Sequence, residues 1–206
     1  MDTGKSSFNT SQMVSVFCMV YNHEPYLRSC LDGFLMQQCD FNYQIVIGED
    51  CSTDKSRAII LEYVQKHPKK FRLLLHEKNI GAAENQKLIF KNCTGKYIAM
   101  CEGDDYWTDP YKLQKQVDFL EKNEEYGLVH HEADYFFQKS GKKIRNHHQT
   151  NKIYPSNGFV FEELLGNNNI YTPTVMFKSS LLKHFMAIDV SVRSSFLMGD
   201  YVMWME

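Results

Sequence analysis

The feature that most constrains this chain is the alternation of short apolar runs with longer amphipathic stretches. The apolar runs have the length of strands and are almost continuously hydrophobic, which is typical of parallel strands buried on both faces. The stretches between them carry apolar residues at helical spacing. Strands are expected at 13–21, 44–48, 71–76 and 97–101, and helices at 26–37, 55–67 and 82–92. Right-handed crossovers between such units build an α/β fold with a mostly parallel central sheet flanked by helices.

The second half of the chain is less regular. A fourth helix is expected from Asp109-Pro110 to about Asn123, because Asp favours the N-cap and Pro is tolerated at the first helical position. Leu128 to Phe137 then predicts another strand, and a further one is expected near Thr174 to Phe177. Residues 139–157 are polar and partly basic, which is typical of a hairpin or a mobile loop.

Single residues mark several helix ends. Pro68 stops the second helix, and Gly95 is expected as the C-terminal signal of the third. Asp54 has the position and the side chain of an N-cap. These residues therefore have a structural explanation that competes with any chemical role.

Composition and charge exclude several classes of function. The 206 residues include 43% hydrophobic and 23% charged residues, with a formal net charge of −2, so nucleic acid is not an expected partner. No apolar run approaches the roughly 18 to 20 residues that span a bilayer. The polar tail of residues 1–12 lacks the apolar stretch of a signal peptide. We therefore expect a cytoplasmic protein, either free or in peripheral contact with the inner face of the plasma membrane.

The six cysteines show no pairing pattern. None forms the C-x-x-C spacing of zinc ribbons or thioredoxin-like motifs. Several lie inside apolar runs, among them Cys18 and Cys101. Reduced cysteines in the core are therefore expected.

Polar clusters follow three of the expected strands. The first strand ends in Tyr21-Asn-His23, the second in Gly48-Glu-Asp-Cys-Ser-Thr-Asp54, and the fourth in Glu102-Gly-Asp-Asp-Tyr-Trp107. In open parallel sheets ligands bind beyond the carboxyl ends of the strands, so these clusters are expected to meet at one edge. Carboxylates crowded together repel one another unless a cation lies among them, and hard divalent cations prefer such oxygens. A metal held there commonly bridges to phosphate.

The glycine loops that bind phosphate in other nucleotide-binding proteins are missing. No G-x-G-x-x-G sequence follows the first strand, and Gly4-Lys-Ser6 lacks the upstream glycine and the strand of a P-loop. Readings as a dinucleotide-dependent dehydrogenase or as a P-loop NTPase therefore lose their main support.

Taken together, the motifs resemble those of family 2 glycosyltransferases of the GT-A fold, over about Met13 to Glu206. The continuation after the acidic cluster resembles bacterial members that build surface polysaccharides. The matching segments, in chain order, are Val14-Ser-Val-Phe-Cys-Met-Val-Tyr-Asn22, Glu49-Asp-Cys-Ser-Thr-Asp54, Asn79-Ile-Gly81 with Asn85, Gly95-Lys-Tyr-Ile98, Glu102-Gly-Asp-Asp105 and Tyr106-Trp-Thr-Asp-Pro-Tyr-Lys-Leu113. Each segment alone is weakly specific, and the first five in order, with matching strand and helix contexts, are strongly so.

The resemblance implies a nucleoside-diphosphate-sugar donor, a UDP-sugar by family frequency, and a site for Mn²⁺ or Mg²⁺. Tyr21 would stack on the nucleobase, Asp50 would accept one of its N–H groups, and Asp104 would contact the ribose or the metal shell. Asp105, with Glu102, would coordinate the metal. The implied donor-binding set is Tyr21, Asn22, Glu49, Asp50, Asn79, Gly81, Asn85 and Asp104. Glu49 and Glu102 stand where the family usually has Asp.

The resemblance also implies an inverting mechanism with one general base, an Asp or Glu late in the domain. Asp200, in Gly199-Asp-Tyr-Val-Met-Trp204, matches that motif and also suits the cap of a terminal helix. The chain stops six residues later, inside that expected helix. We therefore expect one GT-A catalytic domain over 13–206, with a nucleotide-sugar-binding half at 13–126 and an acceptor half at 127–206 that is truncated at its C-terminus.

The acceptor is expected to be a hydroxyl of a glycan or of a lipid-linked glycan. Weak candidates for its cleft are polar residues of the second half: His130, His131, Glu132, Asp134, Thr172 and Thr174. The Tyr106-Trp107 pair suits a sugar-stacking edge or the core equally well.

Two other functions stay open at this point. A non-catalytic nucleotide-sugar-binding module would keep Asp50 and Asp105 without needing Asp200. A sugar nucleotidylyltransferase shares a related fold and would need a glycine-rich basic loop after the first strand, which Tyr21-Asn-His-Glu24 does not supply.

Overall fold

The computed structural model describes residues 12–152 and 169–182 of the chain. The tail is therefore described only at Gln12. The elements, in chain order, are β1 Val14–Val20, α1 Leu27–Leu35, β2 Tyr43–Glu49, α2 Ser56–Lys66, β3 Phe71–Leu75, α3 Ala82–Asn92, β4 Tyr97–Met100, α4 Lys112–Lys122, β5 Leu128–Val129, β6 Tyr135–Phe137, β7 Lys142–Ile144, α5 His147–Thr150, β8 Met176–Lys178 and two short 3-10 turns, η1 Thr172–Thr174 and η2 Ser179–Leu181. The first seven elements confirm the expected strands and helices to within a few residues.

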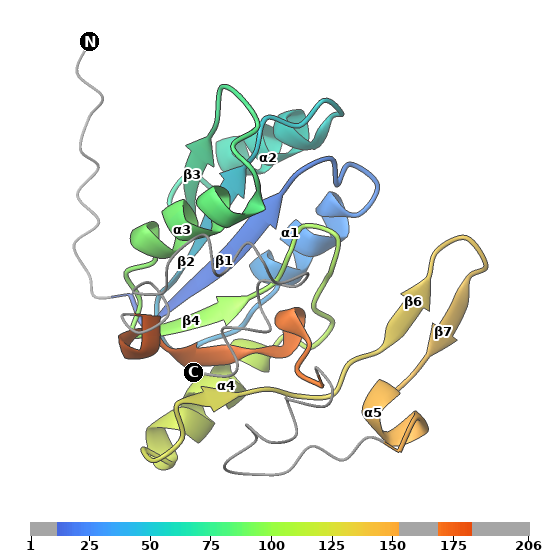
Figure 1. Cartoon of the computed structure of the whole chain (residues 1–206). Coiled ribbons are helices and arrows are strands. Elements are labelled where there is room, and N and C mark those ends of the chain that lie inside the picture. The colour runs from blue at the N-terminus through green and yellow to red at the C-terminus, as the bar shows by residue number, and fades with distance from the viewer. Residues whose placement is uncertain (1–11, 153–168, 183–206) are drawn as a thin grey trace.

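A six-stranded sheet with the order β3-β2-β1-β4-β8-β5 forms the centre of the fold (Figure 1). The four strands β1 to β4 run parallel, and β8 pairs antiparallel with both β4 and β5. The mostly parallel α/β sheet predicted from the sequence is thus confirmed. The carboxyl ends of β1, β2 and β4 point to the same edge, as the crossover rule requires.

Two apolar layers cover the sheet. One layer packs α1, α2 and α4 against side chains such as Val16, Ile45 and Ala99. The other packs α3 against Phe17, Val46 and others. Successive residues of each strand point to opposite faces, so burial on both faces explains why these strands are almost continuously hydrophobic.

The fourth helix begins later than the sequence predicts. It starts at Lys112, because the Asp109 Oδ1 atom accepts the N–H of Tyr111 in a turn before the helix. Contacts with the end of α1 hold this turn: Gln37 Nε2 donates to the Asp109 carbonyl at 2.9 Å. The predicted N-cap role of Asp109 is therefore wrong, and the residue shapes the entry to α4 instead.

The predicted strand from Leu128 to Phe137 is also divided. Only β5 joins the central sheet, whereas β6 pairs with β7 in a separate two-stranded hairpin. The hairpin expected within 139–157 is shifted toward the N-terminus: its first strand is β6, before that range, and α5 follows β7 within it. Residues 130–134 leave the sheet between the two strands and line a cavity described below.

Gly95 has a different role from the predicted helix stop. The residue after α3 is Cys93, in an extended conformation. A Cβ atom on Gly95 would lie 2.6 Å from the Ser15 backbone nitrogen, so glycine is needed for close approach to β1.

All six cysteines are free, and Cys18, Cys30 and Cys101 are buried, as predicted. In the described part of the chain, no helix has the length and apolar character that a membrane span needs.

Candidate active site

Three loops meet beyond the carboxyl ends of β1, β2 and β4. Backbone N–H groups of the β1 loop donate to side chains of the β2 loop: Asn22 to Ser52 Oγ at 3.0 Å, His23 to Ser56 Oγ at 2.9 Å, and Glu24 to Asp54 Oδ2 at 2.9 Å. Tyr21, at the start of the first loop, is 44% exposed. The loops therefore form a hydrogen-bonded frame that leaves the Tyr21 ring accessible to a ligand.

Asn22 has a conformation that few residues adopt. Its φ of 58° is left-handed, a region in which Asn is enriched. Its Oδ1 atom accepts the N–H of Thr53 at 2.8 Å. Asp54 accepts the N–H of Ser56, the first residue of α2, at 2.8 Å, but the N-cap residue is Lys55, so the predicted N-cap position is one residue too early. Both side chains act on the loop backbone.

Asp50 connects the second strand to the third helix. It is only 3% exposed, and its two carboxylate oxygens accept the N–H groups of Ile80 at 2.7 Å and Gly81 at 3.0 Å. Asn79 Oδ1 also accepts the Gly81 N–H, at 3.0 Å. The fold thus brings Asp50 to the loop that contains Asn79 and Gly81, although Asp50 is 31 residues from Gly81 in sequence.

Glu49 and Asn85 are buried beneath that loop. Glu49 is completely buried, where its carboxylate accepts the N–H of Ser52 and pairs with Arg57. Asn85 is 2% exposed and donates to the Gly48 carbonyl at 2.9 Å. These two predicted donor-binding residues therefore support the loop from below in this structure.

The acidic cluster follows β4. Gly103 lies close to the first loop, because a Cβ there would come within 2.7 Å of His23 Nδ1. Asp104 is exposed, with its Oδ1 atom 4.0 Å from His23 Nδ1. Burial, and then the Asp104 carboxylate, raise the pKa of Asp105 to about 6. Among the described residues no hydrogen bond or ion pair is formed by the Asp105 carboxylate.

These carboxylates fit the expected divalent cation. No group of three or more His, Cys, Asp or Glu side chains is arranged around a metal position in the described part of the chain. A catalytic Mg²⁺ or Mn²⁺, however, is usually held by one or two carboxylates, with phosphate oxygens and water completing its shell. Asp105 meets this requirement, since it is a half-buried carboxylate whose raised pKa a bound cation would lower. Glu102, in the same turn, is the second candidate.

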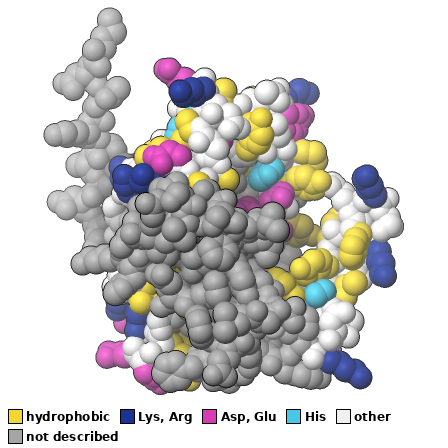
Figure 2. Space-filling model, in the orientation of Figure 1, with side chains coloured by type: hydrophobic (Ala, Val, Ile, Leu, Met, Phe, Trp, Pro, Cys, Tyr) yellow, Lys and Arg dark blue, Asp and Glu magenta, His cyan; other side chains and the backbone are white. Residues whose placement is uncertain are grey.

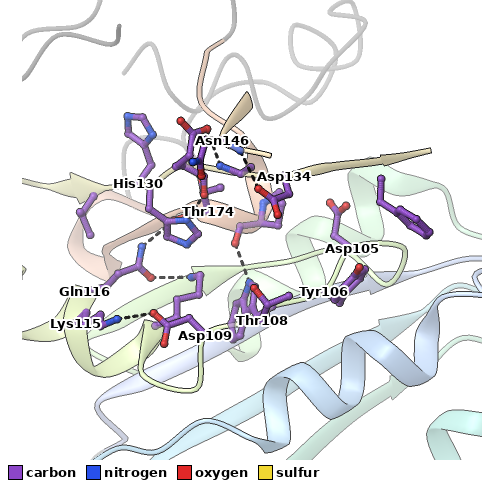
Figure 3. A pocket seen from close by; sticks show the side chains of 18 of the residues that line it. Asp105, Tyr106, Thr108, Asp109, Lys115, Gln116, His130, Asp134, Asn146 and Thr174 are labelled. Atoms are coloured by element: carbon purple, nitrogen blue, oxygen red, sulfur yellow. Dashed lines mark hydrogen bonds and ion pairs between the residues drawn. The ribbon is translucent and has the colours of Figure 1, made fainter. Parts of the chain in front are cut away.

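A cavity of about 740 Å³ lies beside this cluster (Figure 3). Its walls come from the segment 104–109, from α4, from residues 129–134 after β5, and from the β6–β7 hairpin. Asp105 and Tyr106 stand at one end of the view and His130 at the other. The cavity therefore begins where the acidic cluster ends, and its far walls belong to the second half of the chain.

Tyr106 and Trp107 have separate environments. Trp107 is 5% exposed, and its ring packs on Phe34 with the centroids 4.8 Å apart while Nε1 donates to the Pro173 carbonyl. Tyr106 is 43% exposed and lines the cavity. Of the two roles left open for this pair, Trp107 therefore takes core packing, whereas Tyr106 is available to a ligand.

Lys112 is a cavity residue that the sequence analysis missed. It is 4% exposed, with its ammonium 4.2 Å from the centre of the Trp107 ring and 2.7 Å from Gln116 Oε1. Burial lowers the pKa of this ammonium to about 7. A helical projection shows the signal, since Lys112 shares the buried face of α4 with Leu113 and Val117.

Most of the polar acceptor-side candidates line the cavity, namely His130, His131, Glu132, Asp134 and Thr174. Burial acts to raise the pKa of Glu132, but three backbone N–H groups outweigh it and lower the pKa. The Glu132 carboxylate accepts hydrogen bonds from the N–H groups of Ala133, His148 and Gln149. Asp134 pairs with Lys143 at 3.1 Å. Asp200, the predicted general base, lies outside the described residues.

Comparison with known proteins agrees with this architecture. An uncharacterized protein of Mycobacterium tuberculosis is 40% identical over 129 residues, which are 63% of this chain and 37% of that protein. Staphylococcus aureus TarS, residues 1–349 in complex with UDP, superposes with a TM-score of 0.65 at 21% identity, over 93% of this chain and 54% of that 1–349 chain. The mannosyltransferase PcManGT of Pyrobaculum calidifontis, in complex with GDP-Man and Mn²⁺, gives 0.64 at 17% identity, over 88% and 49%.

These similarities establish the fold and the family. The solved structures confirm the GT-A fold. At these sequence identities the similarity is evidence for the fold and not for the activity. The chain spans little more than a third of the length of its mycobacterial relative. The family model for glycosyl transferase family 2 matches residues 15–185. The chain belongs to glycosyl transferase family 2.

Proposed function

We propose that the chain transfers a sugar from a nucleoside-diphosphate donor to a hydroxyl of a glycan or a lipid-linked glycan, with inversion at the anomeric carbon. The observation that carries this proposal is the Asp105 carboxylate. It is half-buried, its pKa is raised to about 6, and it stands between the loop frame at the strand ends and the 740 Å³ cavity. A donor on one side and an acceptor on the other would meet there.

The donor-binding residues divide into two groups in this proposal. Tyr21, which is exposed, stacks on the nucleobase. Asp50 accepts a nucleobase N–H through a lone pair that Ile80 and Gly81 leave unused, since each carboxylate oxygen has two. Asp104, also exposed, contacts the ribose. The remaining residues position these three, and they are Asn22, Glu49, Asn79, Gly81 and Asn85.

Asp105 and Glu102 hold Mn²⁺ or Mg²⁺ in the proposed enzyme. Such an ion, bound to the donor diphosphate, neutralises the charge that grows on the departing nucleoside diphosphate. The TarS complex with UDP and the PcManGT complex with GDP-Man and Mn²⁺ support this donor chemistry. We favour UDP for this chain and place the enzyme in the cytoplasm, peripherally at the inner face of the plasma membrane.

The donor site can be tested by calorimetric titration with UDP, GDP, dTDP and CDP, each with and without Mn²⁺. We expect one nucleotide to bind in a Mn²⁺-dependent way, and Asp105→Asn to weaken this binding at least tenfold. Asp118→Asn is the matched control, since this exposed residue of α4 accepts a hydrogen bond from Gln114 on the same helix, and it should bind as the wild type does. Unchanged Mn²⁺-dependent binding by Asp105→Asn would contradict the proposed metal site.

Asp200 is the proposed general base, which takes the proton of the acceptor hydroxyl as that oxygen attacks. We expect Asp200→Asn to lower turnover by about 10² to 10⁴ while the nucleotide dissociation constant stays the same. That outcome separates an enzyme from a binding module. Loss of nucleotide binding together with turnover would instead make Asp200 a binding or folding residue.

A further inference from the structure

The β6–β7 hairpin, residues 135–145, extends away from the central sheet as a separate arm (Figure 1). We call it the arm. Tyr135 pairs with Ile144, Phe136 with Lys143 and Phe137 with Lys142. At its base, the Tyr135 ring packs against the His147 ring, tilted by 32° with centroids 4.1 Å apart, and His147 Nδ1 hydrogen-bonds with the Tyr171 hydroxyl at 2.7 Å. These ring contacts fix the base of the arm and leave the outer part in solvent.

The arm exposes three consecutive aromatic residues. Tyr135, Phe136 and Phe137 are 40%, 51% and 47% exposed. Side chains alternate along a strand, so Phe136 lies on one face of the hairpin and Phe137 on the other. A surface that docks a protein partner concentrates its apolar side chains on one face. Apolar rings on both faces instead fit a medium that surrounds the hairpin.

The arm is also strongly cationic. Its eleven residues include Lys139, Lys142, Lys143 and Arg145 and no acidic residue, although the whole chain has a net charge of −2. Asp134, just before the arm, pairs with Lys143 at 3.1 Å. Each phenylalanine stands opposite a lysine. Figure 2 shows hydrophobic and basic side chains intermixed over this hairpin, at the right of the view.

We propose that the arm docks the protein on an anionic lipid bilayer. Aromatic rings favour the boundary between headgroups and acyl chains, and Lys and Arg are attracted to anionic headgroups. The polar tip, Gln138 to Gly141, keeps the arm at the level of the headgroups. This inference rests on the proposed function in one respect, the peripheral membrane contact. It identifies the surface that makes this contact and the kind of lipid that the surface binds.

The arm also connects the membrane with the cavity. Phe136 and Lys143, on one face of the hairpin, are part of the cavity wall. A bilayer in contact with the arm therefore lies at the mouth of the cavity. A lipid-linked acceptor could reach the Asp105 end of the cavity without leaving the membrane.

The test is co-sedimentation of the full chain with vesicles of phosphatidylcholine alone or mixed with phosphatidylglycerol, at low and high salt. We expect binding to the anionic vesicles only, and weaker binding at high salt. Phe136→Ser with Phe137→Ser should lower partitioning at least tenfold, and Lys139→Gln with Lys142→Gln should remove the preference for phosphatidylglycerol. Tyr135 is kept, because it holds the base of the arm.

The matched controls remove similar groups elsewhere. Leu61 and Tyr111 are 46% and 48% exposed, so Leu61→Ser with Tyr111→Ser should bind vesicles as the wild type does. Lys69→Gln with Lys122→Gln is the corresponding control for charge. Calorimetric nucleotide binding should be the same in all four double variants, which separates this proposal from the proposed function. Failure of the wild type to bind anionic vesicles, or equal loss in arm and control variants, would overturn the proposal.

Discussion

Gly81 is a glycine because of its backbone angle. Its φ is +85°, and no heavy atom lies within 4 Å of the position that a Cβ would take. Its N–H donates to Asp50, so a strained backbone at this position would also disturb the proposed donor-binding loop. We expect Gly81→Ala to lower the free energy of unfolding by about 1 kcal/mol and to weaken nucleotide binding. Urea denaturation and calorimetry measure the two effects.

Gly141 provides the control for this prediction. Its φ is +67°, it has the same open surroundings, and it lies in the turn of the arm. Gly141→Ala should lose a similar amount of stability and bind nucleotide normally. Normal nucleotide binding by Gly81→Ala as well would show that this loop is not part of the donor site.

Lys112 should make the stability of the protein depend on pH. Burial lowers its pKa from 10.5 to about 7, so between these values the unfolded chain holds a proton that the folded chain has released. Stability therefore rises with pH in this window, by about 1.4 kcal/mol per pH unit. The stability of Lys112→Met should lack this rise, so its advantage over the wild type is largest near pH 7 and shrinks toward pH 10.

Urea denaturation of both proteins across this pH range measures the difference. Lys115→Met is the control, since Lys115 lies on the same helix, is exposed, and pairs with Asp109. Its pH dependence should follow that of the wild type. Parallel curves for Lys112→Met and the wild type would mean that the Lys112 ammonium keeps an ordinary pKa in the folded protein.

At the scale of elements, α3 packs on β2 through Gly48. A Cβ there would lie 2.0 Å from Asn85 Oδ1 and 2.6 Å from Ile89 Cδ1. Gly48→Ala should therefore displace α3 and cost about 1 to 3 kcal/mol in urea denaturation. Gly127→Ala meets only the end of the flexible Leu181 side chain, at 2.8 Å, and should cost less. Equal losses of stability in Gly48→Ala and Gly127→Ala would show that glycine at position 48 is not needed for the packing of α3 on β2.

The elements that the sequence predicts well are those with a strong local pattern. The strands β1 to β4 and the helices α1 to α3 have continuous or periodic apolar residues, and their bounds were predicted to within a few residues. The start of α4 was not, because Gln37 and Gln38 of the α1 end bond the backbone of Asp109 and Pro110. The break between β5 and β6 depends in the same way on tertiary pairing with β8 and β7.

Across the whole molecule, the cysteines differ in burial, so their rates of alkylation can locate a bound nucleotide. Burial raises the pKa of Cys39 to about 11 and that of Cys93 to about 12, and Cys18, Cys30 and Cys101 are buried. We expect Cys51, which follows Asp50 and is only partly buried, to be alkylated first in the native protein. Bound nucleotide should slow this reaction, as mass spectrometry of the alkylated protein can measure. Protection of another cysteine instead would place the nucleotide elsewhere.

The position of the site was predictable from the sequence, and the environment of each residue was not. Strand ends in a parallel sheet meet by rule, which located Tyr21, Asp50 and Asp105 at one edge. The burial of Glu49 and Asn85 depends on how α2 and α3 cover the loop, which no local pattern specifies. A helical projection places Lys112 on the buried face of α4, whereas the contacts of its ammonium with Trp107 and Gln116 depend on tertiary packing.

Because β8 lies between β4 and β5 in the sheet but follows both in sequence, this side of the sheet can form only late during synthesis on the ribosome. The strands β1 to β4 and the helices α1 to α3 are complete once Met100 has emerged. Until Lys178 has emerged, β4 has an open edge and β5 has no strand to pair with. Open edges invite pairing with other chains. The nascent protein therefore carries its aggregation risk at the β4 edge of the sheet, during the interval in which residues 101–178 are translated.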